Sequence, residues 1–164
     1  MSVKINTKVK KFKVSATSEL EINSIDLIGK NVVLYFYPKD NTPGCTQEGE
    51  DFRDLYKEFK KLKTEIYGIS RDSLKSHEGF KTKYKYPFEL ISDPDEKLCN
   101  LFDVIKEKNM YGKKYMGIER STFLINKDGK LSAEWRKVKV NGHAIEVLEA
   151  CLLYTSPSPR DFTE

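Results

Sequence analysis

The sequence predicts an α/β fold in which a mixed central sheet is flanked by helices, and three observations support it. Residues 31–38 form a continuous apolar, β-branched and aromatic run that ends in proline, as expected of a central strand buried on both faces. After this run, apolar residues recur at helical spacing along one stripe. Further strand-like runs then alternate with helical ones, which favours parallel strands joined by helices. The helical stripe comprises Phe52, Leu55, Tyr56, Phe59 and Leu62.

The remaining elements follow from local patterns. Two short strand-like runs separated by a turn predict an N-terminal β-hairpin, and the turn residues "KDG" predict a second hairpin late in the chain. Asp72 or Ser73 is suited to cap a helix that follows the second long strand. In order, we predict strands at 11–16, 20–24, 31–38 and 64–72, a helix at 73–84, a strand at 88–94, a short helix at 95–104, two strands within 120–138, and a helix at 142–153.

Length and composition indicate a globular protein. The chain has 164 residues, the size of one ordinary domain, of which 38% are hydrophobic and 33% are charged. We expect a single domain over residues 1–153. Residues 154–164 are rich in serine and proline and cannot continue the last helix, so we expect a disordered or non-native tail there.

Charge and cysteine content argue against several classes of function. The formal net charge is +4, and the lysines alternate with apolar residues, which is typical of solvated faces of amphipathic elements. The sequence shows no nucleic-acid-binding motif, no membrane span, no leader peptide and no zinc-ligand spacing. We therefore expect a cytoplasmic protein with reduced thiols, without nucleic-acid or membrane partners and without a bound cofactor or metal.

Cys45 stands where the loop after the central strand enters the predicted helix. In open α/β sheets, binding and catalytic sites gather at the carboxyl ends of the strands. The free N–H groups of a helix's first turn stabilise anions, so a cysteine there has a larger thiolate fraction. Pro43 and Gly44 suit this first turn, and Thr42 supplies a hydroxyl close to the sulfur. The alternative is a small buried thiol that only packs.

The residues around Cys45 resemble a known family. Pro38, Thr42 and Cys45 form the pattern P-x-x-x-T-x-x-C, which is similar to the signature of the peroxiredoxins, thiol peroxidases with a thioredoxin-like fold. The stretches "TPGCTQE" and "FRDLY" resemble the bacterioferritin comigratory protein, or Q-type, subfamily. The similarity extends over nearly all of residues 5–150, through "YGISRDSLKSHEGFKTKY", "PFELISDPDEKL" and "KKYMGIERSTFLINKDGKL".

The resemblance implies a role for each residue of the site. Cys45 would attack a peroxide and become a sulfenic acid, Thr42 would hydrogen-bond the peroxide, and Arg120 would supply positive charge beside the sulfur. Pro38 would shield the pocket, and Glu48 would orient the arginine or the loop. Hydrogen peroxide and organic hydroperoxides would be the substrates, with thioredoxin, glutaredoxin or glutathione as reductant. We expect the protein to be a monomer or a weak homodimer.

Two of these residues also have a purely structural explanation. Glu48 is also an ordinary first-turn glutamate favoured by the helix dipole, and Arg120 could form only a strand-edge salt bridge.

The sequence departs from the subfamily in its resolving cysteine. Many members carry a second cysteine five residues after the first, where this chain has Glu50, and others carry it near residues 74–84, where this chain has none. Cys99 could resolve the sulfenic acid, although its spacing favours a half-buried packing role, and Cys151 continues the apolar stripe of the last helix. We therefore expect a one-cysteine mechanism in which an external thiol reduces the sulfenic acid.

Two other functions are alternatives for a protein with this cysteine. A cysteine-dependent phosphatase needs an arginine six residues after the cysteine, and that residue is Asp51. A thioredoxin-fold interaction module with a structural cysteine remains the alternative, and it does not explain why Thr42 and Arg120 accompany Cys45. The polar surroundings of His77 and His143 predict surface histidines. Trp135 and the tyrosines are expected to pack with the strands.

Overall fold

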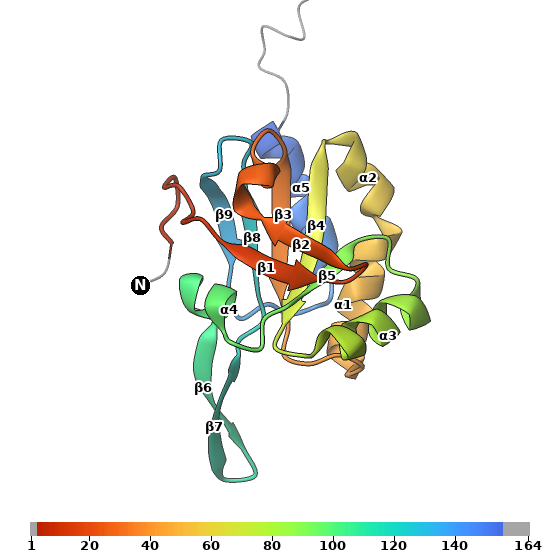
Figure 1. Cartoon of the computed structure of the whole chain (residues 1–164), viewed down its shortest axis with the longest axis vertical. Coiled ribbons are helices and arrows are strands. Elements are labelled where there is room, and N and C mark those ends of the chain that lie inside the picture. Colours follow the sequence, from red (N-terminus) through yellow and green to blue (C-terminus); the bar gives the residue numbers. More distant parts are fainter. Residues whose placement is uncertain (1–2, 156–164) are drawn as a thin grey trace, which may run out of the picture.

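A computed structural model of the chain describes residues 3–155. Within these residues, one sheet has seven strands in the order β2-β1-β5-β4-β3-β8-β9, and a two-stranded sheet, β6-β7, projects from the body (Figure 1). The strands are β1 Lys13–Ala16, β2 Leu20–Asn23, β3 Asn31–Phe36, β4 Thr64–Ser70, β5 Glu89–Ser92, β6 Ile105–Met110, β7 Lys113–Ile118, β8 Ser121–Ile125 and β9 Leu131–Trp135. The helices are η1 Ser24–Leu27, α1 Pro43–Asp54, α2 Tyr56–Lys61, α3 Leu74–Tyr84, α4 Lys97–Leu101 and α5 His143–Thr155.

Strand β3 forms the centre of the sheet, as its apolar run predicts. It pairs in parallel with β4 and in antiparallel with β8, so the sheet is mixed as predicted. Successive side chains of a strand point to opposite faces, and those of β3 and the next residue divide between two separate hydrophobic cores. Val32, Leu34 and Phe36 enter one core, and Val33, Tyr35 and Tyr37 enter the other.

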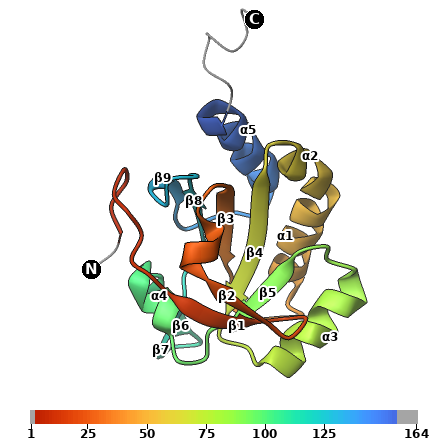
Figure 2. The same cartoon turned by 45° about the horizontal axis from the view of Figure 1, so that its top comes forward.

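The two faces of the sheet carry different helices. Helices α1, α2, α3 and α5 cover one face, which we call the α1 face, and η1 and α4 lie on the other, which we call the α4 face (Figure 2). The two cores between them bury most of the large apolar residues of the described chain. Since α1 follows the loop after β3, the first turn of α1 lies at the end of a strand whose last five residues are fully buried.

Several predicted elements are confirmed. The N-terminal hairpin is present as β1 and β2, and the predicted late hairpin is present as β8 and β9. Ser73 caps α3, because its hydroxyl accepts the backbone N–H of Ser76 at 3.1 Å. The expected tail at residues 154–164 cannot be assessed, because residues 156–164 lie outside the described part, and helix α5 itself continues to Thr155. The single domain over residues 1–153 stays a prediction.

Three local predictions are wrong. The stripe predicted one helix, but Leu55 (φ −102°, ψ 2°) separates α1 from α2, with the same stripe continuing across the break. Helix α4 is shorter than residues 95–104, because Glu96 has a left-handed backbone (φ 59°) that no α-helix accommodates. The helical pattern of residues 73–84 also predicts that Leu74 faces partly inward, but Leu74 is 39% exposed, since it opens α3 next to the cap.

The β6-β7 hairpin was not predicted. Its strands are largely exposed, so they lack the apolar runs that identify buried strands. The turn consists of Tyr111 and Gly112, both with positive φ (51° and 80°), which is the conformation of a tight hairpin turn. The available signal was the dipeptide "YG" together with the alternating lysines before it, Lys106 and Lys108.

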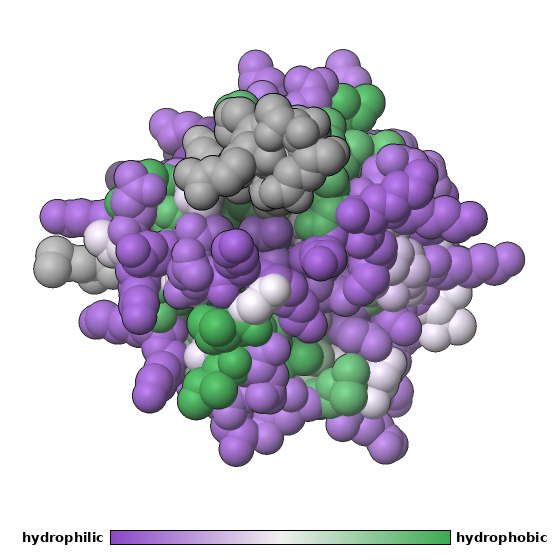
Figure 3. Space-filling model, turned by 90° about the horizontal axis from the view of Figure 1, so that it is seen from above, coloured by the Kyte–Doolittle hydropathy of each residue, from purple (hydrophilic) through white to green (hydrophobic). Residues whose placement is uncertain are grey.

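At the end of the molecule away from the β6-β7 hairpin, the surface is mostly hydrophilic, with small separate hydrophobic groups (Figure 3). Among residues 3–155, no helix combines the length and the apolar character needed to cross a bilayer.

Candidate active site

Cys45 lies in the first turn of α1, directly after the loop that follows β3. Thr42 has an extended backbone (ψ 153°) and is the N-cap, and Pro43 occupies the first turn, where a missing N–H costs nothing. The N–H of Thr46 donates to the Thr42 carbonyl at 2.9 Å and closes the first turn. The Cys45 side chain is 1% exposed, so its sulfur faces the protein and not bulk solvent.

Arg120 reaches Cys45 from the start of β8, the strand that pairs with β3 on the side away from β4. It immediately precedes β8, whose first residue, Ser121, pairs with Phe36 at the end of β3. This register brings together two residues 75 positions apart, and Arg120 Nη2 lies 3.4 Å from Cys45 Sγ. The carbonyl of Arg120 accepts the N–H of Val138 at 3.0 Å, which holds its backbone in place.

Glu48 completes this arrangement one helical turn after Cys45. Its Oε1 accepts a hydrogen bond from Arg120 Nη1 at 2.6 Å, so the same guanidinium contacts both side chains. Such a fork of parallel donors is a property of arginine that lysine does not share. The structure therefore brings together the three predicted site residues Cys45, Glu48 and Arg120.

Two glycines allow this close packing. A Cβ on Gly44 would lie 3.1 Å from Arg120 Nη2, so a side chain there would push the guanidinium away from the helix. A Cβ on Gly49 would lie only 2.3 Å from the hydroxyl oxygen of Tyr86, which crosses α1 and donates to the Thr46 carbonyl at 3.1 Å. The absence of side chains at both positions lets α1 pack closely against Arg120 and Tyr86.

The electrostatics of the site are unusual for a carboxylate. Burial raises the pKa of Glu48 to about 7, and the Arg120 charge and hydrogen bond oppose that rise without cancelling it. Glu48 Oε2 is buried and finds no hydrogen-bond partner among the described residues. For Arg120, burial lowers the pKa but Glu48 and Cys45 raise it by more, so the guanidinium stays charged. The sulfur thus faces a permanent positive charge.

Lys108 on β6 is a further charged residue near the site, and sequence reasoning missed it. Burial, followed by the positive charge of Arg120, lowers the pKa of its ammonium, and Cys45 acts on it with the opposite sign. Its backbone belongs to the β6-β7 ladder, where Lys108 pairs with Tyr115. Its position was not accessible from sequence because the β6-β7 hairpin was not predicted.

Thr42 and Pro38 belong to the segment between β3 and the first turn of α1. The Thr42 hydroxyl donates to the Lys39 carbonyl at 2.9 Å, which leaves its oxygen lone pairs available to accept from another group. Thr42 and Pro38 are both partly buried. The structure gives no direct hydrogen bond between Thr42 and Cys45.

The other two cysteines lie far from this arrangement. Cys99 is fully buried in the core of the α4 face, whereas Cys45 belongs to the core of the α1 face, so the sheet separates them. Cys151 shares the α1 face, but its thiol interacts with Thr64, which pairs with Asn31 at the far end of β3. The six residues of β3 span roughly 17–20 Å. The described residues contain no disulfide.

Both histidine predictions are wrong. His77 is fully buried and His143 is 4% exposed. His77 contacts Asp40 and the Ile91 carbonyl, while His143 Nε2 lies 2.8 Å from the Thr122 hydroxyl. Burial lowers the pKa of His143. The polar neighbours in sequence were misleading, because buried histidines are satisfied by groups that lie far along the chain.

Comparisons with known proteins agree with this geometry. Residues 5–134 match the AhpC/TSA family. The chain is 60% identical over 122 residues to peroxiredoxin Bcp of Xanthomonas campestris, covering 74% of this chain and 76% of that protein. It is 48% identical over 149 residues to peroxiredoxin Bcp of Bacillus subtilis, covering 91% of this chain and 95% of that protein.

Solved structures show the same fold. A peroxiredoxin Q mutant of Xylella fastidiosa superposes with a TM-score of 0.89 at 41% identity, covering 94% of this chain and 98% of that one. Peroxiredoxin Q of Xanthomonas campestris superposes with a TM-score of 0.85 at 51% identity, covering 88% and 92%. The predicted thioredoxin-like fold is thereby confirmed. The chain belongs to the AhpC/TSA family and is a peroxiredoxin, a thiol peroxidase.

Proposed function

We propose that Cys45 is the peroxidatic residue of this thiol peroxidase. Its thiolate attacks one oxygen of ROOH, an S–O bond forms, and the O–O bond breaks. The products are a cysteine sulfenic acid and an alkoxide or hydroxide, which takes up a proton to leave as ROH or water. The observation that carries this proposal is the 3.4 Å contact between Arg120 Nη2 and Cys45 Sγ in the first turn of α1.

Arg120 and Thr42 are proposed to act on the reacting atoms. The guanidinium stabilises the thiolate before the reaction and the negative charge on the leaving oxygen during it. The Thr42 hydroxyl, anchored on the Lys39 carbonyl, accepts a hydrogen bond from the peroxide and orients it along the line of attack.

Glu48 and Pro38 are proposed to support these groups. The 2.6 Å contact of Glu48 with Arg120 Nη1 fixes the plane of the guanidinium, which leaves Nη2 directed at the sulfur. Pro38 lies at the end of the buried strand run and limits access of water to the sulfur.

A one-cysteine mechanism is proposed for the second half of the cycle. An external thiol attacks the sulfenic acid, releasing water and forming a mixed disulfide, and a second thiol then releases Cys45. The positions of Cys99 across the sheet and of Cys151 at its far end support this. Burial raises the pKa of Cys151 to about 12 and raises that of Cys99 as well, so neither thiol is a ready nucleophile.

Substrate and partners are proposed by similarity. A solved structure of the bacterioferritin comigratory protein of Xanthomonas campestris comes from work on alkyl peroxide reduction. We propose hydrogen peroxide and alkyl hydroperoxides as substrates here. Peroxiredoxins use thiol reductants, and we propose thioredoxin, glutaredoxin or glutathione as the source of electrons here. We also propose that the protein acts in the cytoplasm as a monomer or weak homodimer.

One experiment tests both half-reactions. Reduced protein is mixed with one equivalent of hydrogen peroxide, and a sulfenic-acid reagent is added before peptide mapping. We expect labelled Cys45, with the same yield and rate in Cys99→Ser and Cys151→Ser, and no peroxide consumption beyond free thiol in Cys45→Ser. A disulfide between Cys45 and Cys99, or label that accumulates only after Cys99 is replaced, would contradict the one-cysteine mechanism.

A further inference from the structure

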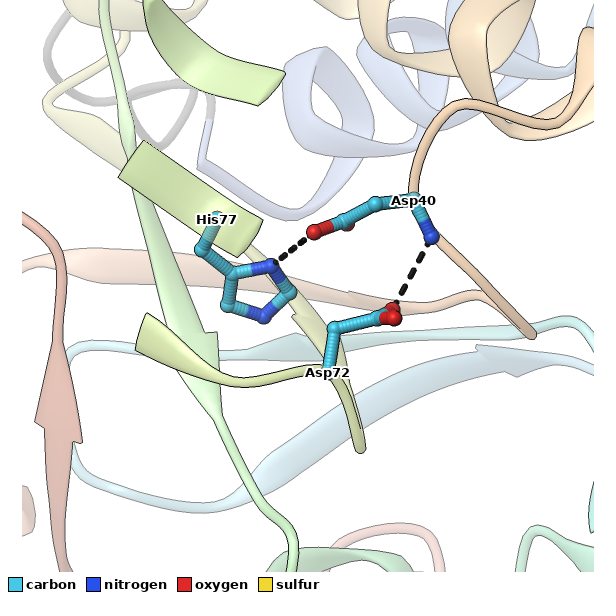
Figure 4. Close-up of side chains that lie close together, drawn as sticks. All are labelled: Asp40, Asp72 and His77. Atoms are coloured by element: carbon cyan, nitrogen blue, oxygen red, sulfur yellow. Dashed lines mark hydrogen bonds and ion pairs between the residues drawn. The ribbon is translucent and has the colours of Figure 1, made fainter. Parts of the chain in front are cut away.

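A buried polar cluster connects the loop before α1 to the start of α3. Asp40 lies two residues before Thr42, and His77 lies in the second turn of α3. Figure 4 shows their side chains directed at each other, with Asp72 beside them. The His77 and Asp40 side chains are 0% and 2% exposed. This cluster takes no part in the chemistry described above.

The Asp40 carboxylate accepts three hydrogen bonds from side chains. Its Oδ1 accepts from the Tyr37 hydroxyl at 2.6 Å, and its Oδ2 accepts from the Ser76 hydroxyl at 2.8 Å and contacts His77 Nδ1 at 2.7 Å. The backbone N–H of Asp40 donates to Asp72 Oδ2 at 2.9 Å. Residue 40 is therefore tied to α3 and its preceding loop through both its side chain and its backbone.

The partners of His77 locate its protons. His77 Nε2 lies 2.9 Å from the Ile91 carbonyl, which can only accept, so Nε2 carries a hydrogen. At Nδ1, a bare nitrogen lone pair would face a carboxylate oxygen, so a proton lies in that contact too. Both ring nitrogens and both Asp40 oxygens are thus engaged in hydrogen bonds.

These contacts define the course of the loop that carries the peroxide-binding hydroxyl. Between the buried Tyr37 and the N-cap Thr42, Asp40 is the residue with the most hydrogen bonds to other parts of the fold. The Thr42 hydroxyl is itself held on Lys39, the neighbour of Asp40. A shift of Asp40 would therefore displace Thr42, whereas the contacts of Arg120 with Glu48 and Cys45 involve α1 and the start of β8 only.

We propose that His77 is a positioning residue for peroxide reduction, which acts by donating a hydrogen bond to Asp40 and so holds Thr42 in register with Cys45. His77 contacts neither the sulfur nor the guanidinium, so it does not act on the reacting atoms. The inference rests on the proposed roles of Thr42 and Cys45.

Two isosteres of His77 separate its two hydrogen bonds. The amide nitrogen of His77→Asn stands near Nδ1 and can donate to Asp40, while that of His77→Gln stands near Nε2 and can donate only to the Ile91 carbonyl. We expect the single-turnover rate with hydrogen peroxide to fall by about tenfold or more in His77→Gln and to stay within about threefold of wild type in His77→Asn. Lys75→Gln, an exposed neighbour on α3, is the matched control and should keep the wild-type rate.

A second readout distinguishes positioning from loss of structure. Alkylation of Cys45 by iodoacetamide needs the thiolate but not Thr42, so we expect His77→Gln to retain its alkylation rate while losing peroxide rate. Asp72→Ala, which removes the tie to the Asp40 N–H, should lower the peroxide rate in the same selective way. Thermal unfolding is measured for every variant.

The outcomes are decisive. Equal peroxide rates in His77→Asn and His77→Gln, or parallel losses of peroxide and alkylation rates in His77→Gln and Asp72→Ala, would overturn the inference. Thr42→Val is measured alongside. If Thr42→Val keeps the wild-type rate, the proposed role of Thr42 fails; if it is slow while His77→Gln keeps the wild-type rate, only the inference about His77 fails.

Discussion

Cys45 and Cys99 are equally buried, but they lie on opposite faces of the main sheet and meet opposite charges. Cys45 faces the Arg120 guanidinium at 3.4 Å. Cys99 lies beside Asp93, whose Oδ2 accepts its backbone N–H at 2.8 Å, and burial together with this carboxylate raises the pKa of its thiol. Two cysteines with the same degree of burial therefore differ in the charge that lies beside the thiol. Burial is the larger cause of the raised pKa of Cys99 and the Asp93 carboxylate adds to it, whereas the nearest charge to the Cys45 sulfur is positive.

The largest expected effect comes from removing the positive charge at Cys45. Arg120→Ala should lower the single-turnover rate with hydrogen peroxide by about 100-fold or more, because the leaving oxygen loses its stabilising donor. Stopped-flow measurement of peroxide consumption checks this. Arg136→Ala, which removes an arginine that binds the carbonyls of Phe102 and Asp103, is the matched control and should keep the wild-type rate.

An Arg120→Ala variant within a few-fold of the wild-type rate would show that the helix N-terminus alone activates Cys45.

A second effect concerns the stability cost of burying Glu48, the carboxylate that accepts a hydrogen bond from Arg120. The pKa of Glu48 is raised from 4.5 to about 7, so the folded protein binds this proton more tightly than the unfolded chain does. Relative to its value at high pH, the free energy of unfolding is therefore higher below pH 4.5, where Glu48 is protonated in both states. This advantage is lost as the pH rises to about 7. Between these values Glu48→Gln should gain up to about 3 kcal/mol of unfolding free energy relative to wild type.

Denaturant unfolding at several pH values measures this difference. Glu50→Gln, on the same helix with a partly exposed side chain, should show no comparable trend. A difference between Glu48→Gln and wild type that does not change with pH would contradict the raised pKa of Glu48. The peroxide rate of Glu48→Gln should fall because the guanidinium loses its charged anchor.

A smaller effect is expected at Lys108. Its ammonium interacts electrostatically with Arg120 and Cys45, but it is partly solvated, so its contribution is screened. Lys108→Met should lower the peroxide rate by about threefold, and added salt should reduce the difference. Lys106→Met on the same strand, where the lysine pairs with Asp103, should have no effect.

A salt-independent loss in Lys108→Met, or an equal loss in Lys106→Met, would indicate that the hairpin matters through its shape and not through this charge.

The smallest effect is expected at Cys99, the second cysteine of the comparison. Asp93→Asn removes the negative charge beside Cys99 but retains an acceptor for its N–H. Because burial is the larger cause of the raised Cys99 pKa, iodoacetamide labelling of Cys99 in the folded protein should change by no more than about twofold. A tenfold increase would show that the carboxylate, and not burial, keeps this thiol unreactive.

The sequence predicted the fold better than it predicted the surroundings of the site. The apolar run of β3, the stripe of α1 and the helix signals after β4 are local, so they could be recognised without knowing the partners. The break at Leu55 and the β6-β7 hairpin were missed because neither is encoded by a strong hydrophobic pattern. The resemblance of "TPGCTQE" and "IERSTFLI" to peroxiredoxins then indicated Cys45 and Arg120 as site residues.

Taken alone, the sequence determined the α/β class, the place of Cys45 at a helix N-terminus, and the residues that could accompany it. Only the tertiary structure decided that Arg120 contacts both Cys45 and Glu48, that the sheet separates Cys45 from Cys99, and that His77 is buried against Asp40. The physical reason is that helix and strand signals depend on neighbours a few residues away. Charge pairing and burial depend on strand register, which joins residues far apart in the chain.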